Sequence, residues 1–103
     1  MARVVVSPVA QADTAVIIRD LAAKAGWRVA ADYVASFETL YDRLAAFPES
    51  GAPRFEFGRH VRIGLVSPYV VVYRYVPDSG LVGVIRALHG SRNIARKLLA
   101  SAS

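Results

Sequence analysis

The chain has 103 residues, of which 54% are hydrophobic, and it contains no cysteine and carries a formal net charge of +5, so it has the size of a single domain covering residues 1–103. No apolar run approaches the roughly 18 residues of a membrane-spanning helix, and no signal-peptide pattern opens the chain, so we expect no membrane contact and a cytoplasmic location. Two histidines without any cysteine cannot form a zinc site, so neither a metal nor another cofactor is expected.

The positive charge is concentrated in the second half of the chain. Residues 1–53 carry five basic and six acidic side chains, whereas residues 54–103 carry eight basic and two acidic ones. Seven of these eight cations are arginines, which pair well with carboxylates and phosphates. The composition therefore predicts an acidic partner, either nucleic acid or a negatively charged protein segment.

A short strand and a long helix are predicted at the start of the chain. Arg3–Val6 is an apolar run, and Ser7 and Pro8 after it suit the N-cap and first position of a helix. This helix should run to about Ala25 and end at Gly26 in a left-handed conformation. Because its apolar residues form no single stripe, we expect it to lie between a second helix and a sheet.

A second helix is predicted by residues that recur every three or four positions: Val29, Tyr33, Phe37, Leu40, Leu44 and Phe47. Trp27 is expected to close the corner between the two helices, and Pro48 and Gly51 to end the second one. The loop at 49–59 should expose Arg54 and Arg59. A last short helix is expected after Ser91, with Ile94, Leu98 and Leu99 on its apolar side.

Three antiparallel strands are predicted between this loop and the last helix. Val61–Val66 and the run from Tyr69 are joined by Ser67 and Pro68, so Arg62 should lie opposite Tyr73, Ile63 opposite Val72 and Leu65 opposite Val70. The second turn is Pro77 to Gly80. If Val76 pairs with Leu81 across it, Val71 lies opposite Arg86, Val72 opposite Ile85 and Val70 opposite Ala87.

This register predicts two different sheet faces. The aliphatic face, expected to pack on the helices, carries Ile63, Leu65, Val70, Val72, Ile85 and Ala87, with Arg74 near its end. The opposite face, expected to meet a partner, carries Arg62, Gly64, Tyr69, Val71, Tyr73, Tyr75, Val84 and Arg86. Two arginines close together on one face would repel unless a partner supplied an anion.

The layout and several residues resemble the ParE branch of the ParE/RelE toxin superfamily. The matching residues are Ser7, Pro8, Ala10 and Asp13, then Ala31, Tyr33, Phe37, Leu40, Leu44, Pro48 and Gly51, then Arg62, and finally the runs 69–75 and 84–92. The resemblance implies an α+β fold in which a helical hairpin packs on an antiparallel β-sheet, in the order β-α-α-β-β-β with a short C-terminal α-helix.

The resemblance also implies a function and partners. It predicts the toxin of a type II toxin–antitoxin system that inhibits DNA gyrase, takes part in plasmid stabilisation and is neutralised by a ParD-type antitoxin in a heteromeric complex. Nucleic acid would then be contacted only through the antitoxin or gyrase. We take as antitoxin- or target-binding residues Arg62, Tyr69, Tyr73, Tyr75, Arg86 and Arg92.

Two alternatives remain at this point. The RelE branch uses the same fold for ribosome-dependent cleavage of messenger RNA, which needs a general base and cations around the phosphate. In that case His89 or Tyr73 would be the base, and Arg62 and Arg86 the phosphate stabilisers. The other alternative is a non-toxic basic module that binds nucleic acid directly. Because no clear proton-transfer group accompanies the arginines, binding is favoured over catalysis.

Overall fold

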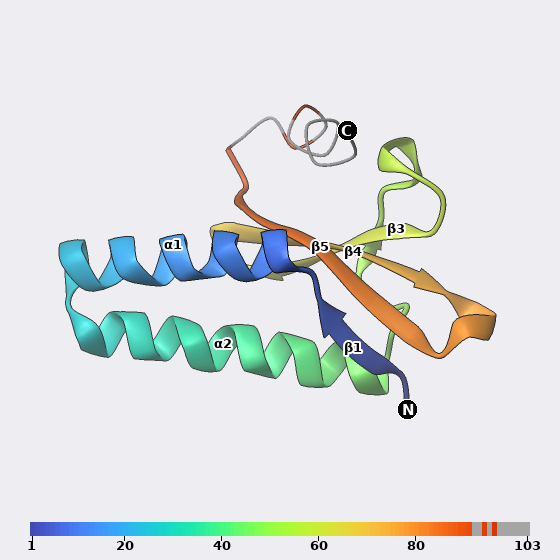
Figure 1. Cartoon of the computed structure of the whole chain (residues 1–103), viewed down its shortest axis with the longest axis horizontal. Coiled ribbons are helices and arrows are strands. Elements are labelled where there is room, and N and C mark those ends of the chain that lie inside the picture. The colour runs from blue at the N-terminus through green and yellow to red at the C-terminus, as the bar shows by residue number, and fades with distance from the viewer. Residues whose placement is uncertain (92–93, 95, 97–103) are drawn as a thin grey trace.

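The computed structural model describes residues 1–91, 94 and 96. After the first strand, two helices come before the other strands of the sheet (Figure 1). The elements in chain order are β1 (Arg3–Val6), α1 (Pro8–Ala25), α2 (Trp27–Ala46), β2 (Ala52–Pro53), the 3₁₀ turn η1 (Phe55–Phe57), β3 (Val61–Val66), β4 (Tyr69–Val76), the 3₁₀ turn η2 (Pro77–Ser79) and β5 (Leu81–His89). Ile94 and Arg96 are helical, and the rest of the predicted last helix lies outside the described residues.

The strands form one five-stranded sheet in the order β1-β5-β4-β3-β2. The sheet is mixed, because β1 pairs parallel to β5 while the other neighbours are antiparallel. The predicted helical hairpin on a sheet is therefore confirmed, and β1 and the two-residue β2 extend the predicted meander at its two edges. Neither α1 nor α2 has the length and apolar content that crossing a bilayer requires.

The sequence signals at the ends of α1 act as predicted. The Ala10 N–H donates to Ser7 Oγ at 3.1 Å, and the same hydroxyl donates to the Ile85 carbonyl at 3.1 Å. Ser7 therefore caps the helix and also ties its first turn to β5. Gly26 ends α1 with a φ of 95°, a backbone region that favours glycine.

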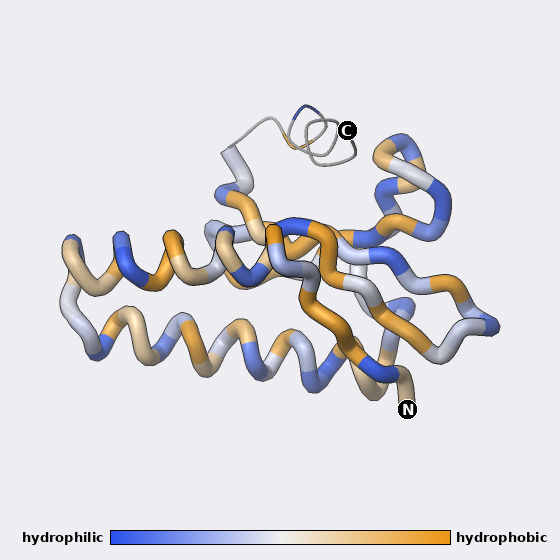
Figure 2. The backbone as a smooth tube through the Cα atoms, in the orientation of Figure 1, coloured by the Kyte–Doolittle hydropathy of each residue, from blue (hydrophilic) through white to orange (hydrophobic). Residues whose placement is uncertain are grey.

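The prediction that α1 lies between a second helix and the sheet is wrong for most of its length. The helical hairpin extends beyond the sheet on one side (Figure 1), and Ala10 is the one buried residue of α1. Hydrophobic and hydrophilic positions alternate along the projecting part of both helices (Figure 2). Trp27 does not close the inter-helix corner either, because it is 71% exposed at the tip.

The register of the sheet agrees with the prediction at the first turn and departs from it after the second. The pairs Arg62–Tyr73, Ile63–Val72 and Leu65–Val70 are all present. Val76 pairs with Leu81 as expected, but Tyr73 pairs with Val84 and Val72 with Arg86, so Ile85 is an extra residue in β5. This β-bulge shifts the remainder of the strand by one position.

The assignment of the two sheet faces is also wrong. The helices cover the face that carries Val71, Tyr73, Val82 and Val84, with Tyr69 and Tyr75 packed against the same cluster. The aliphatic face lies on the other side of the sheet and has a second, smaller core of Val61, Ile63, Val70 and Val72, packed against Phe57, Ile85 and Ile94. Both faces are apolar enough to be buried, so aliphatic content alone did not identify the helix-covered side.

Candidate functional site

The structure separates the predicted site residues into two groups. Arg62 pairs with Tyr73 and Arg86 pairs with Val72, and consecutive residues of β4 point to opposite faces. Because the β-bulge interrupts this alternation at Arg86, its side chain nevertheless reaches Asp13 of α1, whereas Arg62 reaches the loop after α2. The prediction that they form one partner-facing pair is wrong, because the two guanidinium groups bind different segments of the chain.

Arg62 holds the segment that follows α2. Its Nη1 donates to the carbonyls of Glu49 and Gly51 at 3.1 and 3.0 Å, and its Nη2 lies 3.7 Å from the Glu49 carboxylate. The guanidinium carbon is also 5.9 Å from the centre of the Phe55 ring. Because the guanidinium donors serve the chain's own carbonyls, Arg62 fixes the loop that leads into β2.

Tyr73 belongs to the same group and is a core residue. Its side chain is 0% exposed, its hydroxyl donates to the Pro48 carbonyl at 2.8 Å, and it accepts from the Gly51 N–H at 2.9 Å. Burial raises the pKa of the Tyr73 phenol, which the Gly51 hydrogen bond and the Arg62 charge partly offset. A buried phenol with a raised pKa and both hydrogen-bonding roles occupied is poorly suited to act as a general base.

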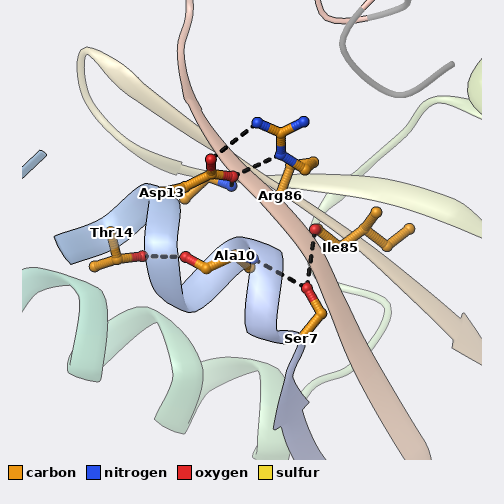
Figure 3. A network of polar contacts seen from close by, with 7 residues as sticks. Ser7, Ala10, Asp13, Thr14, Ile85 and Arg86 are labelled. Carbon is orange, nitrogen blue, oxygen red and sulfur yellow. Dashed lines mark hydrogen bonds and ion pairs between the residues drawn. The ribbon is translucent and has the colours of Figure 1, made fainter. Parts of the chain in front are cut away.

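Arg86 is held by Asp13 of α1 in a bidentate ion pair (Figure 3). Arg86 Nε and Nη2 donate to the two Asp13 oxygens at 2.6 and 2.9 Å, and the Ala87 backbone N–H donates to Asp13 Oδ2 at 3.1 Å. The hydrogen bond to Asp13 raises the pKa of Arg86 further above its ordinary value. Asp13 therefore neutralises a half-buried arginine and satisfies a backbone donor on β5.

This ion pair lies at one end of a groove between α1 and the second half of β5. The groove exists because β1 pairs only with residues 81–84 of β5, while β5 continues to His89. Its volume is about 700 Å³. Apolar side chains of α1 face polar groups along it, and the lining residues are Asp13, Val16, Ile17, Asp20, Leu21, Lys24, Tyr69, Arg86, Ala87, Leu88, His89 and Ser91.

Three of the predicted residues, Tyr69, Arg86 and His89, meet in this groove. The Tyr69 ring lies edge-on to His89 at 5.7 Å and to Tyr33 at 5.6 Å. Burial, then Tyr33 and Asp20, raise the pKa of the Tyr69 phenol. The His89 Nδ1 accepts from the Ser91 N–H at 3.1 Å and lies 2.7 Å from Ser91 Oγ. The groove thus offers an amphipathic binding surface with charges of both signs.

The remaining predicted residues lie apart from the groove. Tyr75 is half-buried, and its hydroxyl donates to the Pro77 carbonyl at 3.2 Å. Arg92 lies outside the described residues. The α1 side of the groove, including Ile17, Asp20, Leu21 and Lys24, was not among the predicted site residues, because no local pattern shows that α1 lies beside a strand more than sixty residues away.

The described part of the chain shows no arrangement typical of a hydrolytic or metal centre. Across residues 1–91, 94 and 96, no three His, Asp or Glu side chains are placed to hold a metal ion. The two arginines proposed to stabilise a phosphate are separated, and each already has a carboxylate partner. The groove beside α1 is the described feature that could receive an amphipathic polypeptide segment.

The overall fold is similar to that of a chain in a solved structure. The chain superposes with a TM-score of 0.71 on a chain of the "Chromosomal ParDE TA system from P. aeruginosa", with 20% identity, covering 86% of this chain and 96% of that one. At this level of identity the similarity establishes the fold and no more.

The sequence comparisons identify the family. Residues 4–94 match the family described as "ParE toxin of type II toxin-antitoxin system, parDE". The chain is 31% identical over 98 residues to "Toxin ParE3" of Caulobacter vibrioides, covering 95% of this chain and 96% of that protein. The chain therefore belongs to the ParE toxin family of type II toxin–antitoxin systems.

Proposed function

We propose that the protein is a toxin that inhibits DNA gyrase by binding it, without itself being an enzyme, and that a ParD-type antitoxin neutralises it. The observation that carries the proposal is the family match over residues 4–94. A cytoplasmic location and a contribution to plasmid stabilisation belong to the same proposal, because gyrase acts on intracellular DNA and the resemblance to ParE toxins implies both.

The positions of the candidate catalytic groups support binding over ribonuclease activity. Tyr73 is buried with its hydroxyl occupied, and Arg62 is bonded to the carbonyls of Glu49 and Gly51. A ribonuclease of the RelE type would need a base and cations converging on one phosphate. Arg62 binds the loop after α2 and Arg86 binds Asp13 of α1, so the two guanidinium groups do not converge on one point.

Gyrase inhibition is tested with purified components. The chain is added to gyrase and relaxed plasmid in the absence of ribosomes, and the supercoiled product is quantified. Inhibition that increases with the toxin concentration and is relieved by a ParD-type antitoxin is expected. If supercoiling is unaffected while a ribosome-bound transcript is cut, the ribonuclease alternative replaces this proposal.

For the antitoxin we propose the groove between α1 and β5 as the main contact, with Tyr69 and Arg86 on one wall and α1 on the other. The groove presents exposed apolar surface, since Val16 is 45% exposed, together with charges of both signs on the α1 wall and the Arg86 cation on the β5 wall. An amphipathic antitoxin segment would bury the apolar strip of α1 and pair its charges with those of the walls.

The groove is tested by Val16→Asp, which places a charge on the α1 wall without disturbing a buried position. Affinity for a co-expressed ParD-type antitoxin should fall by at least about tenfold, as when an apolar contact is replaced by a desolvated charge. Val34→Asp is the matched control, because Val34 is also an exposed helical valine, at 39%, and does not line the groove. Equal affinities for the two variants would exclude the groove as the main contact.

A further inference from the structure

Gly83 lies within β5 at a position where the fold itself does not require glycine. Its φ is not in the positive region occupied by Gly26, Gly58 and Gly80. A Cβ built on Gly83 meets no heavy atom within 4 Å, whereas one built on Gly64 would lie 2.8 Å from Leu40 Cδ1. Glycine inside a strand costs stability and often marks a place where another molecule approaches the backbone.

The residues around Gly83 form an open patch on the side of the sheet away from the helices. Val5 and Arg74 flank Gly83 on the neighbouring strands, and Arg3, Leu81 and Val76 pair in the adjacent row. We call these six residues the Gly83 face: Arg3, Val5, Arg74, Val76, Leu81 and Gly83. Val5 is 45% and Val76 40% exposed, so exposed apolar side chains lie near a backbone position that has no side chain.

The helices contribute none of the excess positive charge of the chain. Asp13 and Glu49 are paired with Arg86 and Arg62, and the rest of the two helices carries four cations and four anions. The net charge of +5 therefore comes from the strands and their loops and from the last residues of the chain, which contribute Arg92, Arg96 and Lys97. Arg3 and Arg74 are exposed and have no ion-pair partner within the described residues.

We propose that the Gly83 face is the contact surface for the toxin's cellular target and that it receives an acidic segment of that target protein. The target's backbone would pass over Gly83, its aliphatic side chains would cover Val5 and Val76, and its carboxylates would pair with Arg3 and Arg74. Arginine is suited to this role because its guanidinium can bind a carboxylate with two parallel hydrogen bonds.

The composition of the face favours a protein over a nucleic acid. Three of its six residues are aliphatic, it contains no aromatic side chain on which a base could stack, and it has only two cations. The face is also separated by the sheet from the groove beside α1. The inference rests on the proposed function in one respect: it assigns the groove to the antitoxin and the Gly83 face to the target.

Gly83→Val separates these roles, because it adds a side chain at a position where a Cβ meets no heavy atom of the protein within 4 Å. The variant should fold with a melting temperature equal to or above that of the wild type, since valine favours a strand. It should keep wild-type affinity for a ParD-type antitoxin. Growth inhibition on expression in bacteria, and inhibition of gyrase supercoiling, should both require at least tenfold more toxin.

Arg74→Ala tests the charged part of the same face, with Arg43→Ala on α2 as the control for loss of one exposed arginine. Arg74→Ala should weaken growth inhibition by about fivefold or more and Arg43→Ala should not. If Gly83→Val and Arg74→Ala remain as toxic as the wild type, or if they lose antitoxin binding instead, the inference is overturned.

Two further outcomes distinguish the inference from the function on which it rests. A wild type that stops growth without affecting gyrase would show that another target is involved, and the growth assay would still test the Gly83 face. If Gly83→Val instead weakens binding to a bare DNA duplex while antitoxin and target affinities stay unchanged, the partner class proposed here is wrong.

Discussion

At the scale of single residues, Asp13 connects α1 to two successive residues of β5. Its carboxylate accepts from two nitrogens of Arg86 and from the Ala87 backbone N–H, and thereby fixes α1 against the part of β5 that β1 does not cover. The Arg86 and Asp13 side chains are 13% and 15% exposed, so the pair is weakly screened by salt. Removing the anion leaves a partly buried guanidinium without its main partner.

Asp13→Asn should therefore destabilise the protein by about 3 kcal/mol, as when one partner of a buried ion pair is removed. Urea denaturation followed by circular dichroism measures the loss. Asp20→Asn is the control on the same helix, because Asp20 is exposed, and it should change the free energy of unfolding by less than about 0.5 kcal/mol. Similar values for both variants would mean that the ion pair contributes little.

Tyr73 differs from the other tyrosines because it is fully buried and its hydroxyl both donates and accepts. Tyr73→Phe leaves the Pro48 carbonyl and the Gly51 N–H without this partner, at a cost of about 1–3 kcal/mol. Tyr75→Phe removes one hydroxyl with a single, exposed hydrogen bond and should be close to neutral. A Tyr73→Phe protein that keeps its stability and loses toxicity would instead point to a functional hydroxyl.

At the scale of elements, local signals were sufficient for the helices and the first hairpin. Ser7 and Pro8 start α1 and Gly26 ends it as predicted, and the two-residue turn at Ser67 and Pro68 fixes the register of β3 on β4. The register of β5 could not be predicted in full, because the extra residue Ile85 is an ordinary β-branched strand former. One unmarked residue was enough to change the β4 partner of Arg86 from the predicted Val71 to Val72.

The choice of the helix-covered face required tertiary information. Tyr69 and Tyr73 suggested a partner-facing surface, but their rings pack with Phe37 and Leu40 under α2 and the Tyr73 hydroxyl reaches loop groups at the edge. A tyrosine can be a core residue when its hydroxyl finds a partner. Sequence alternation identifies which residues share a face and leaves open which face is buried more deeply.

Gly64 is the element-level position where α2 approaches the sheet most closely. A Cβ at Gly64 would lie 2.8 Å from Leu40 Cδ1, so Gly64→Ala should push α2 from β3 and destabilise the fold by about 1–3 kcal/mol. Gly83→Ala is the control in the same sheet and should be neutral or slightly stabilising. Thermal unfolding of the two variants distinguishes them, and a neutral Gly64→Ala would show that Leu40 can move aside at little cost.

At the scale of the whole molecule, the groove beside α1 is formed by residues distant in the sequence. Asp13 and Arg86 are 73 positions apart, and the space between α1 and β5 exists because β1 is shorter than the strand it accompanies. Tyr69, Arg86 and His89 were identified from the sequence as strand residues with functional potential. The α1 wall was not identified, because which strand a helix packs beside depends on the topology of the whole sheet.

Buried phenols make the stability of the whole fold depend on pH at the alkaline end. Burial raises the pKa of Tyr41, Tyr69 and Tyr73 above the ordinary value of 10.0, and the Tyr41 hydroxyl is buried without a hydrogen-bond partner among the described residues. Above about pH 10 the unfolded chain releases these protons while the folded protein still holds them. The unfolded state then binds fewer protons, so the free energy of unfolding falls as pH rises.

The urea midpoint should accordingly be constant between about pH 8 and about pH 9 and decline above about pH 10, as phenolate absorbance appears in step with unfolding. Tyr73→Phe removes one of the three shifted phenols, so its midpoint should start lower at neutral pH and decline less steeply above about pH 10. An equally steep decline in Tyr73→Phe would mean that the Tyr73 phenol does not contribute, because a group that titrates alike in both states leaves the slope unchanged.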